Sequence, residues 1–200
     1  MTTATEFKNQ TKHEAILQYA TRVFAKDGFA ATDVQQIADQ ADVGKGTVYR
    51  YFGNKSDLFL ACADAGMKKL DSCIYNAIEG VDSAVETTRK VASAYAKYFE
   101  KNPEMVEILI QERAAFRGFI PDTHMVYRRK NQGVLGNVLR SGVESGEIRK
   151  LDVRAASDAL ANMLYGTVVC SLEGSNRKLG QMVEQAVEIF LNGILSQPKD

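Results

Sequence analysis

The chain has 200 residues, of which 45% are hydrophobic and 25% charged, and its 25 basic and 25 acidic residues cancel. This composition is ordinary for a globular protein of one or two domains, and zero net charge excludes a protein that coats nucleic acid through bulk charge. Three prolines, no tryptophan and long stretches without turn-forming residues favour a mostly helical fold.

The chain lacks the sequence features of a membrane or secreted protein. No apolar run is long enough to cross a bilayer, and the polar N-terminus MTTATEFKNQTKHE has no secretory signal. Cys62 and Cys73 fall on one predicted helix about 16 Å apart along its axis, too far for a disulfide. We expect a cytoplasmic protein with no membrane contact, in which Cys62, Cys73 and Cys170 are buried free thiols; a redox sensor is the alternative.

A first helix is expected from near Thr11 to Asp27. Gly28 is suited to end it in a left-handed cap, and Phe29 follows as the apolar contact that often accompanies such a cap. The residues expected on its inner face are Ile16, Leu17, Ala20, Val23 and Phe24.

A second, short helix is expected after Thr32. Thr32 is a good N-cap residue, and Gln35 stands three residues later at the capping-box spacing. Apolar residues then recur at helical spacing, at Val34, Ile37, Ala38 and Ala41. Asp42-Val43-Gly44 interrupts the pattern, and Gly44 can adopt the unusual backbone angles of a sharp turn.

A third helix is expected from about Lys45 to Phe52, with Val48 and Phe52 directed inward. The side chains left largely outside are Lys45, Thr47, Tyr49, Arg50 and Tyr51. Two short helices joined by a tight turn match the helix-turn-helix, whose second helix enters the major groove of DNA.

This segment resembles the N-terminal domain of TetR-family transcriptional regulators over roughly the first sixty residues. The matching positions are Ile16, Ala20, Phe24, Gly28, Phe29, Thr32, Ile37, Ala38, Ala41, Val43, Gly46, Thr47, Tyr49, Tyr51, Phe52 and Lys55. One departure is Gly44, where many relatives have serine or threonine; glycine costs a cap only a few tenths of a kcal/mol.

Four residues are expected at DNA phosphates. Thr32 and the first amides of its helix would lie against a phosphate, because helix N-termini favour anions. Lys45 and Lys55 would contact phosphates as mobile charges. The resemblance implies that the Tyr51 phenol also donates to a phosphate. Between Val43 and Ser56 the sequence holds three basic residues and no carboxylate, so this face is locally basic.

The remaining DNA-binding candidates lie on the expected recognition helix. Gly46 would let the backbone approach DNA closely, and Thr47 and Tyr49 would lie on the exposed side. Arg50 would either read a guanine edge with two hydrogen bonds or bind a phosphate. For Tyr49, the ring could belong partly to the core, with only its hydroxyl outside.

A long helix is expected from Lys55 to about Ile78, some 36 Å in length. Its apolar stripe comprises Leu58, Phe59, Cys62, Met67, Leu70, Cys73 and Ile74. No linker-like composition interrupts the chain, so the domain boundary is placed inside this helix rather than at a loop. It would connect a DNA-binding domain, residues 1–54, to a second helical domain, residues 55–200.

Five more helices are expected in the second domain, from Ser83 to Glu100, from Pro103 to about Ala115, from Pro121 to Val143, from Asp152 to about Leu172, and from Leu179 to Leu195. The predicted fold is therefore all-α: a three-helix DNA-binding domain joined by a long helix to an all-helical C-terminal domain. The resemblance implies that this second domain binds a ligand and dimerises.

The last two helices are candidates for a dimer interface. Small residues gather on the first of them, at Ala155, Ala156, Ala159, Met163, Gly166, Thr167 and Cys170, and the other carries an apolar stripe of Val183, Val187, Phe190, Leu191 and Ile194. An ordinary core face is the alternative. TetR-like proteins dimerise through these helices, and a two-fold dimer suits a palindromic DNA site with half-sites about 34 Å apart or a multiple of that.

Adaptable apolar and polar-tipped side chains in the second domain are candidates for lining an effector cavity. They are Tyr95, Phe99, Met105, Leu109, Glu112, Phe116, Met125 and Met163, with Ile108, Phe119 and Tyr165 beside them. Plain core packing is the alternative for each. Glu112 would face a cationic ligand, pair with a neighbouring arginine, or be solvated. His13 and His124 lie near no cysteine cluster, so no metal site and no cofactor are expected.

No catalytic motif appears: the chain has no P-loop, dinucleotide fingerprint, metal-binding His-Glu pattern or nucleophile elbow. We therefore expect a regulator and not an enzyme. The main hypothesis is a homodimer bound to double-stranded DNA at a palindromic operator, acting as a repressor that a small-molecule effector releases. The alternative is a DNA-binding adaptor whose C-terminal domain binds a protein partner and no ligand; a closed core would favour it.

Overall fold

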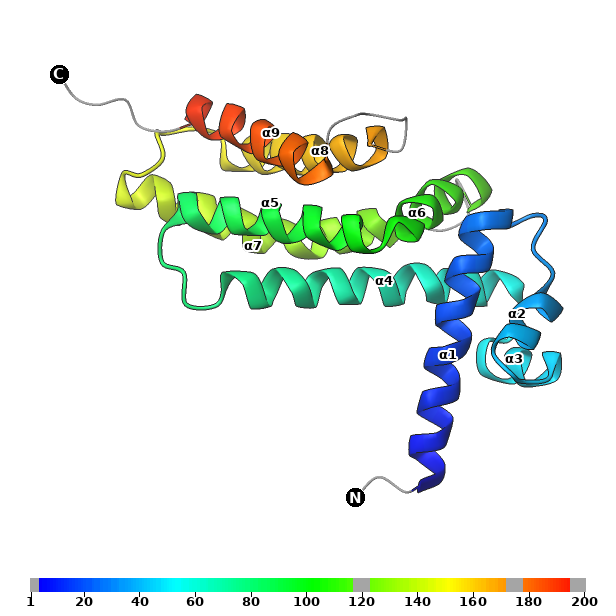
Figure 1. The fold of residues 1–200 in the computed structure, drawn as a ribbon. Helices are drawn as coiled ribbons and strands as arrows, with labels where there is room; N and C mark the ends of the chain where they lie inside the picture. The colour runs from blue at the N-terminus through cyan, green and yellow to red at the C-terminus, as the bar shows by residue number, and fades with distance from the viewer. Residues whose placement is uncertain (1–3, 117–122, 172–177, 195–200) are drawn as a thin grey trace. The chain divides into compact units, whose positions relative to one another are not determined.

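The computed structural model describes residues 4–116, 123–171 and 178–194, which are helical and contain no strand (Figure 1). The predicted all-α fold is confirmed. The helices are α1 Ala4–Asp27, α2 Val34–Gln40, α3 Lys45–Phe52, α4 Lys55–Ile78, α5 Ala84–Lys101, α6 Pro103–Phe116, α7 Thr123–Ser145, α8 Val153–Cys170 and α9 Leu179–Ile194. No helix in these ranges is both long and apolar enough to cross a membrane.

The helix boundaries follow local sequence signals. Ser83 caps α5 by accepting a hydrogen bond from the amide of Glu86, and Asp152 caps α8. Gly28 ends α1 with φ +82°, a conformation that glycine adopts without strain. The clearest difference between the predicted and the observed helices is at the start of α1. This helix begins at Ala4 rather than near Thr11, because no helix-breaking residue separates the two positions. Phe119 and the predicted helix start at Pro121 lie outside the described residues.

The chain divides into two compact units, and α4 continues from one to the other. The first contains residues 1–68 and 103–123, and the second contains residues 69–102 and 124–200. The units divide inside α4, after Lys68, because Leu58, Phe59 and Cys62 are buried in the first unit. Helix α6 also belongs to the first unit, although the whole of α5 precedes it in sequence.

Aromatic rings form the centre of the first unit. Phe24 and Phe59 are fully buried with ring centroids 5.1 Å apart, and Phe29 lies 5.1 Å from Phe59 and 5.0 Å from Phe116 of α6. The amide of Phe29 donates to Gln111 Oε1 over 3.0 Å. Helix α6 is therefore fixed to the end of α1 by both ring packing and a hydrogen bond.

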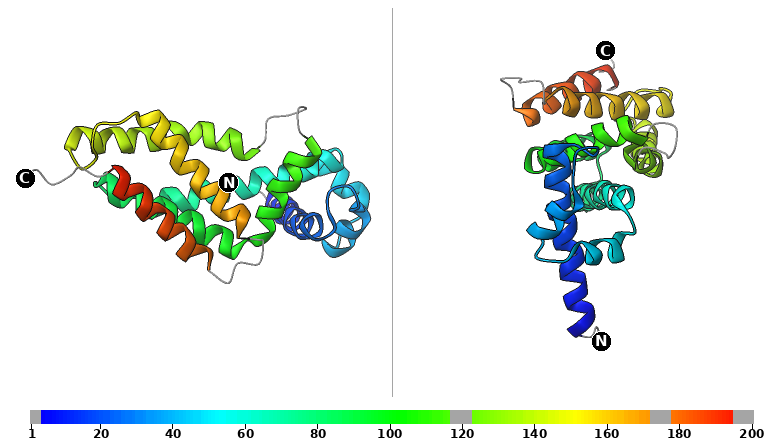
Figure 2. Two further views of the ribbon diagram at one scale, coloured as in Figure 1. Left: turned by 90° about the horizontal axis from the view of Figure 1, so that it is seen from above. Right: turned by 90° about the vertical axis from the view of Figure 1, so that its right-hand side faces the viewer.

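The second unit packs α9 against α5 and α8, and the views in Figures 1 and 2 both show α9 along α5. The apolar stripe predicted on α9 is buried inside the protomer, at Val183, Val187, Phe190, Leu191 and Ile194. Of the two interpretations of this stripe, a dimer interface or an ordinary core face, the burial supports the core face. The exposed apolar residue of α9 is Ile189, at 71% exposure.

The three cysteines are free thiols, but only Cys62 is buried; Cys73 and Cys170 are exposed. Burial raises the pKa of the Cys62 thiol to about 12, and a hydrogen bond with Thr21 opposes this rise. Because the thiolate is the nucleophile, Cys62 in the folded protein is expected to resist iodoacetamide at pH 8 while Cys73 is alkylated. Peptide mass spectrometry before and after unfolding measures this, and rapid modification of native Cys62 would contradict its burial.

Candidate nucleic-acid interface

The turn between α2 and α3 is built differently from the prediction. The residue with positive φ is Asp42 (φ 52°), whereas Gly44 is extended (φ −73°, ψ 147°) and caps α3 with no side-chain hydrogen bond. Aspartate is among the residues that tolerate the left-handed region. The amide of Val43 donates to the carbonyl of Ala38 over 3.0 Å and closes the turn.

The predicted N-cap of α2 is wrong by one residue. Asp33 is the cap and accepts the Gln35 amide at 2.9 Å. Thr32 is only 4% exposed, and its hydroxyl donates to the carbonyl of Gly28 over 2.7 Å. The side chain of Gln35 donates to Asp39 rather than closing a capping box. Thr32 therefore holds the connection from α1 to α2.

The two lysines predicted as mobile charges are both held by the protein. Lys45 Nζ lies 2.9 Å from Asp33 Oδ1, joining the starts of α3 and α2. The pKa of Asp33 is lowered by the Gln35 amide and then by Lys45. Lys55 Nζ donates to the carbonyl of Ala30 over 3.0 Å and lies 5.1 Å from the centre of the Phe29 ring.

Helix α3 has the inner and outer faces that its sequence predicts. Val48 and Phe52 are buried, at 1% and 7% exposure, whereas Arg50 is exposed and Tyr49 is 38% exposed. The guanidinium carbon of Arg50 lies 5.8 Å from the centre of the Tyr51 ring. Arg50 therefore projects from a helix whose opposite side is fixed in the core.

Gly46, Thr47 and Tyr51 complete the outer side of α3. A Cβ added to Gly46 would meet no atom of the described protein within 4 Å. The side chains of Thr47 and Tyr51 are half-buried. Packing inside the protein thus gives no reason for glycine at position 46.

His13 is a contact that the sequence interpretation missed. Its ring stacks on Phe52 at 4.7 Å and lies edge-on to Tyr51 at 5.9 Å. Position 13 lies inside the predicted first helix, and α1 brings the His13 ring beside the end of α3. Its contact with α3 depends on how the helices pack, which no local sequence signal shows.

The effector candidates separate between the two compact units. Met105, Leu109, Glu112 and Phe116 belong to the first unit, and Tyr95, Phe99, Met125 and Met163 to the second. In the first, Met105 and Leu109 are buried, and Phe116 packs with Phe29 and Phe59. In the second, Met125 and Met163 are half-buried.

Glu112 is 1% exposed, so the solvated interpretation is wrong. Its Oε1 accepts hydrogen bonds from the backbone amide of Thr123, at 3.0 Å, and from the Thr123 hydroxyl. Glu112 thereby joins α6 to the first residue of α7, on either side of residues 117–122.

A buried polar cluster lies in the second unit. The hydroxyl of Tyr95 is 3.3 Å from Nε2 of His124, and the His124 ring lies 4.5 Å from the ring of Tyr165. Burial raises the pKa of Tyr95 and keeps its phenol neutral. The sequence interpretation considered His124 only as a zinc ligand. In the described part of the chain, no three histidine, cysteine or acidic residues form a group able to hold a metal.

Known protein families match most of the chain. The family described as "Bacterial regulatory proteins, tetR family" matches residues 16–62, and "Tetracyclin repressor-like, C-terminal domain" matches residues 81–194. The "Fatty acid metabolism regulator protein" of Bacillus subtilis (strain 168) is 28% identical over 169 residues, which are 80% of this chain and 81% of that protein. The repressor KstR2 of Mycolicibacterium smegmatis is 24% identical over 95% of this chain and 94% of its own.

Solved structures of TetR regulators share the fold. PfmR from Thermus thermophilus superposes with a TM-score of 0.75 at 26% identity, covering 88% of this chain and 97% of its own. FadR from Bacillus subtilis, solved with stearoyl-CoA, gives 0.77 at 24% identity, covering 90% and 98%. The predicted family is thus confirmed, and its members are transcriptional regulators rather than enzymes. The chain belongs to the TetR family of bacterial transcriptional regulators.

Proposed function

We propose that this protein is a homodimeric repressor that a small-molecule effector releases from a palindromic operator. The observation that carries the proposal is the structure of α3, with Val48 and Phe52 held in the core and Arg50 projecting outward. A helix fixed in this way can enter a major groove without losing its position in the protein. Arg50 and Tyr49 would meet base edges or nearby phosphates, and Thr47 and Tyr51 would contact the backbone.

Thr32, Lys45 and Lys55 have supporting roles in this proposal, because their polar groups already have partners within the protein. Thr32 would help DNA binding indirectly, by holding α2 in position, because its hydroxyl already donates to the Gly28 carbonyl. Lys45 and Lys55 can still contribute charge at the DNA surface, but each must share its ammonium group with Asp33 or with the Ala30 carbonyl. Their contribution would therefore be smaller than that of unengaged lysines.

For the effector we propose an acyl-CoA or a related acyl thioester. One relative is a fatty acid metabolism regulator, and FadR of Bacillus subtilis was solved with stearoyl-CoA. The acyl chain would lie among apolar candidates such as Phe99 and Met163, and Tyr95 and His124 would offer polar contacts. Binding must favour one conformation of the protein, since a ligand with equal affinity for both shifts nothing.

The dimer interface is proposed at α8 and α9. Ala155, Ala159 and Cys170 of α8 are exposed, and so is Ile189 of α9. The apolar stripe of α9 is already used inside the protomer, so the interface would use the outer sides of these helices. Two recognition helices would then meet successive half-sites of a palindrome.

The test is binding of the purified protein to its own upstream intergenic DNA, with footprinting across a salt series. We expect a protected palindrome, affinity that falls steeply as salt rises, and release by an acyl-CoA. Sequence-independent binding alone would contradict the repressor proposal. Specific binding that no acyl-CoA changes would favour the adaptor, whose C-terminal domain meets a protein partner.

Replacing Gly46 with alanine is expected to separate folding from DNA binding. The added Cβ meets open space in the protein and alanine is the better helix former, so the free energy of unfolding should stay equal or rise by up to about 1 kcal/mol. Affinity for the operator should fall, because the methyl group would occupy the space that the DNA backbone needs. Chemical unfolding and anisotropy titration measure the two effects; unchanged affinity would show that the DNA does not approach Gly46.

A further inference from the structure

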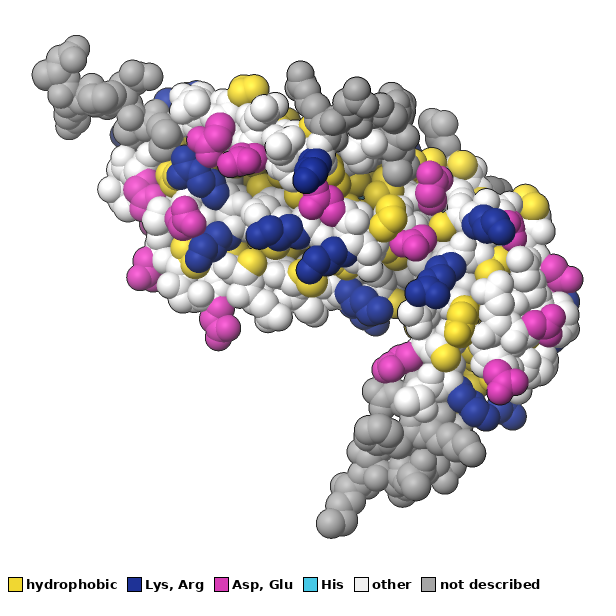
Figure 3. Space-filling model, in the orientation of Figure 1, with side chains coloured by type: hydrophobic (Ala, Val, Ile, Leu, Met, Phe, Trp, Pro, Cys, Tyr) yellow, Lys and Arg dark blue, Asp and Glu magenta, His cyan; other side chains and the backbone are white. Residues whose placement is uncertain are grey.

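The second unit contains a basic groove between α4 and α5, of about 580 Å³. We call it the lysine groove, and its lining includes Lys90, Lys97 and Lys101 of α5 with Cys73 and Asn76 of α4. The lysines lie seven and four residues apart, so they share one face of α5. Figure 3 shows a row of basic side chains along this part of the surface.

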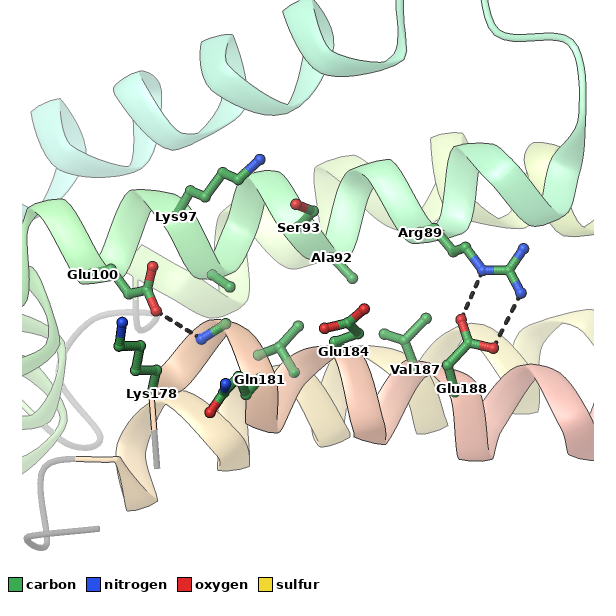
Figure 4. A pocket seen from close by; sticks show the side chains of 13 residues that line it. Arg89, Ala92, Ser93, Lys97, Glu100, Lys178, Gln181, Glu184, Val187 and Glu188 are labelled. Carbon is green, nitrogen blue, oxygen red and sulfur yellow. Dashed lines mark hydrogen bonds and ion pairs between the residues drawn. The ribbon is translucent and has the colours of Figure 1, made fainter. Parts of the chain in front are cut away.

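Two charged residues of α5 hydrogen-bond to α9. Toward α9, Arg89 makes two hydrogen bonds with Glu188, at 2.7 and 3.1 Å, and Glu100 accepts the Gly180 amide at 2.7 Å (Figure 4). In that view Lys97 points away from α9. Arg89 and Glu100 thus bind α9 directly, whereas Lys97 borders both the cleft beside α9 and the lysine groove.

Nothing in the described chain neutralises the lysine groove. None of its three ammonium groups takes part in an ion pair among the described residues, and its lining contains no carboxylate. Lys69 adds a further exposed cation one helical turn before Cys73 on α4. In a chain of zero net charge, a concave site with one sign of charge concentrates ligands of the opposite sign.

We propose that the lysine groove binds a nucleotide diphosphate group, such as that of an acyl-CoA, as part of effector recognition. Mobile ammonium groups suit phosphate oxygens, and the amide of Asn76 and the hydroxyl of Ser93 line the same groove as hydrogen-bonding groups. The link to an acyl-CoA rests on the effector proposed above, whereas the affinity for a nucleotide diphosphate follows from the groove itself.

Calorimetry on the full chain tests the proposal with three probes: acetyl-CoA, ADP, and adenosine as the phosphate-free control. We expect binding of ADP or acetyl-CoA that weakens with salt, and none of adenosine at equal concentration. Acetyl-CoA binding more tightly than ADP identifies a CoA thioester as the source of the group, and equal binding identifies a free nucleotide. Absence of both, or equal binding of adenosine, would overturn the proposal.

A charge-matched pair of variants locates the site. Lys90→Gln with Lys101→Gln should weaken phosphate-dependent binding roughly five- to twentyfold, as expected for the loss of two charge contacts at the protein surface. The control, Lys150→Gln with Arg154→Gln, removes two exposed cations of the second unit outside the groove and should change binding less than twofold. Equal effects of the two double variants would overturn the assignment.

Cys73 reports occupancy of the groove directly. Saturating ADP or acetyl-CoA should slow alkylation of Cys73 by the neutral reagent iodoacetamide, whereas adenosine at the same concentration should leave the rate unchanged. No protection of Cys73 by a probe that binds would place the ligand elsewhere.

Operator binding by the variant with both Lys90→Gln and Lys101→Gln tests the groove proposal independently of the repressor proposal. We expect wild-type affinity and an unchanged salt dependence. A weaker affinity with a smaller salt dependence would assign the two lysines to DNA phosphates and overturn the effector proposal. If the wild-type protein binds ADP or acetyl-CoA but no operator, the repressor function fails and the groove stands.

Discussion

Replacing Arg50 with alanine is expected to weaken operator binding about 5- to 150-fold, the loss of roughly 1–3 kcal/mol that one specific arginine contact supplies. Arg50 is exposed on α3, and the buried contacts of that helix are made by Val48 and Phe52. The fold and the proposed dimer should therefore be unchanged. Anisotropy titration against operator and scrambled DNA measures the loss, and analytical ultracentrifugation measures the dimer.

The two titrations also separate two roles for Arg50. If it reads a guanine, the loss on operator DNA exceeds that on scrambled DNA; if it binds a phosphate, both fall together and the salt dependence becomes smaller. Arg113→Ala is the control, because Arg113 is an exposed arginine of the same compact unit on α6. Wild-type binding by Arg50→Ala would remove Arg50 from the interface.

Replacing Gly142 with alanine is expected to lower the free energy of unfolding by about 1–3 kcal/mol through overpacking. A Cβ built at Gly142 would lie 2.6 Å from Ile148 Cδ1 and 2.7 Å from the Cβ of Ala84. Both neighbours are buried, and the amide of Ile148 donates to the Gly142 carbonyl over 2.9 Å. The new methyl group therefore forces α5 or the Ile148 side chain to move.

Gly133 provides the matched control, since it lies on the same helix and an added Cβ meets nothing within 4 Å. Gly133→Ala should leave stability unchanged or raise it by up to about 1 kcal/mol, because alanine favours the helix. Urea unfolding followed by circular dichroism compares the two variants. Equal stability of both would contradict close packing at Gly142.

Short-range patterns predicted the helix-turn-helix well. Val48 and Phe52 repeat at helical spacing and are buried, so the outer side of α3 follows from geometry alone. A different local signal located the start of α6, because asparagine followed by proline at Asn102-Pro103 favours a helix start and α6 begins at Pro103.

Other features depend on contacts that a local pattern does not contain. Thr32 and Asp33 are both good caps, and the choice depends on where the Thr32 hydroxyl finds the Gly28 carbonyl. Lys55 looks like any surface lysine in sequence, yet it lies over Phe29 because the chain folds back there. The lysine groove likewise appears only when α4 and α5 bring their residues together.

The placement of α6 constrains which segments of this regulator could be exchanged with those of its relatives. Phe116 and Gln111 complete the packing around Phe29, so a fragment ending at Asn54 lacks part of its own core. A chimera that joins residues 1–54 to a foreign sensor domain should fold only if the foreign α4 and α6 present compatible side chains. Recombination at a loop therefore cannot swap operator specificity cleanly; new specificity is reached more readily by substitutions on the outer side of α3.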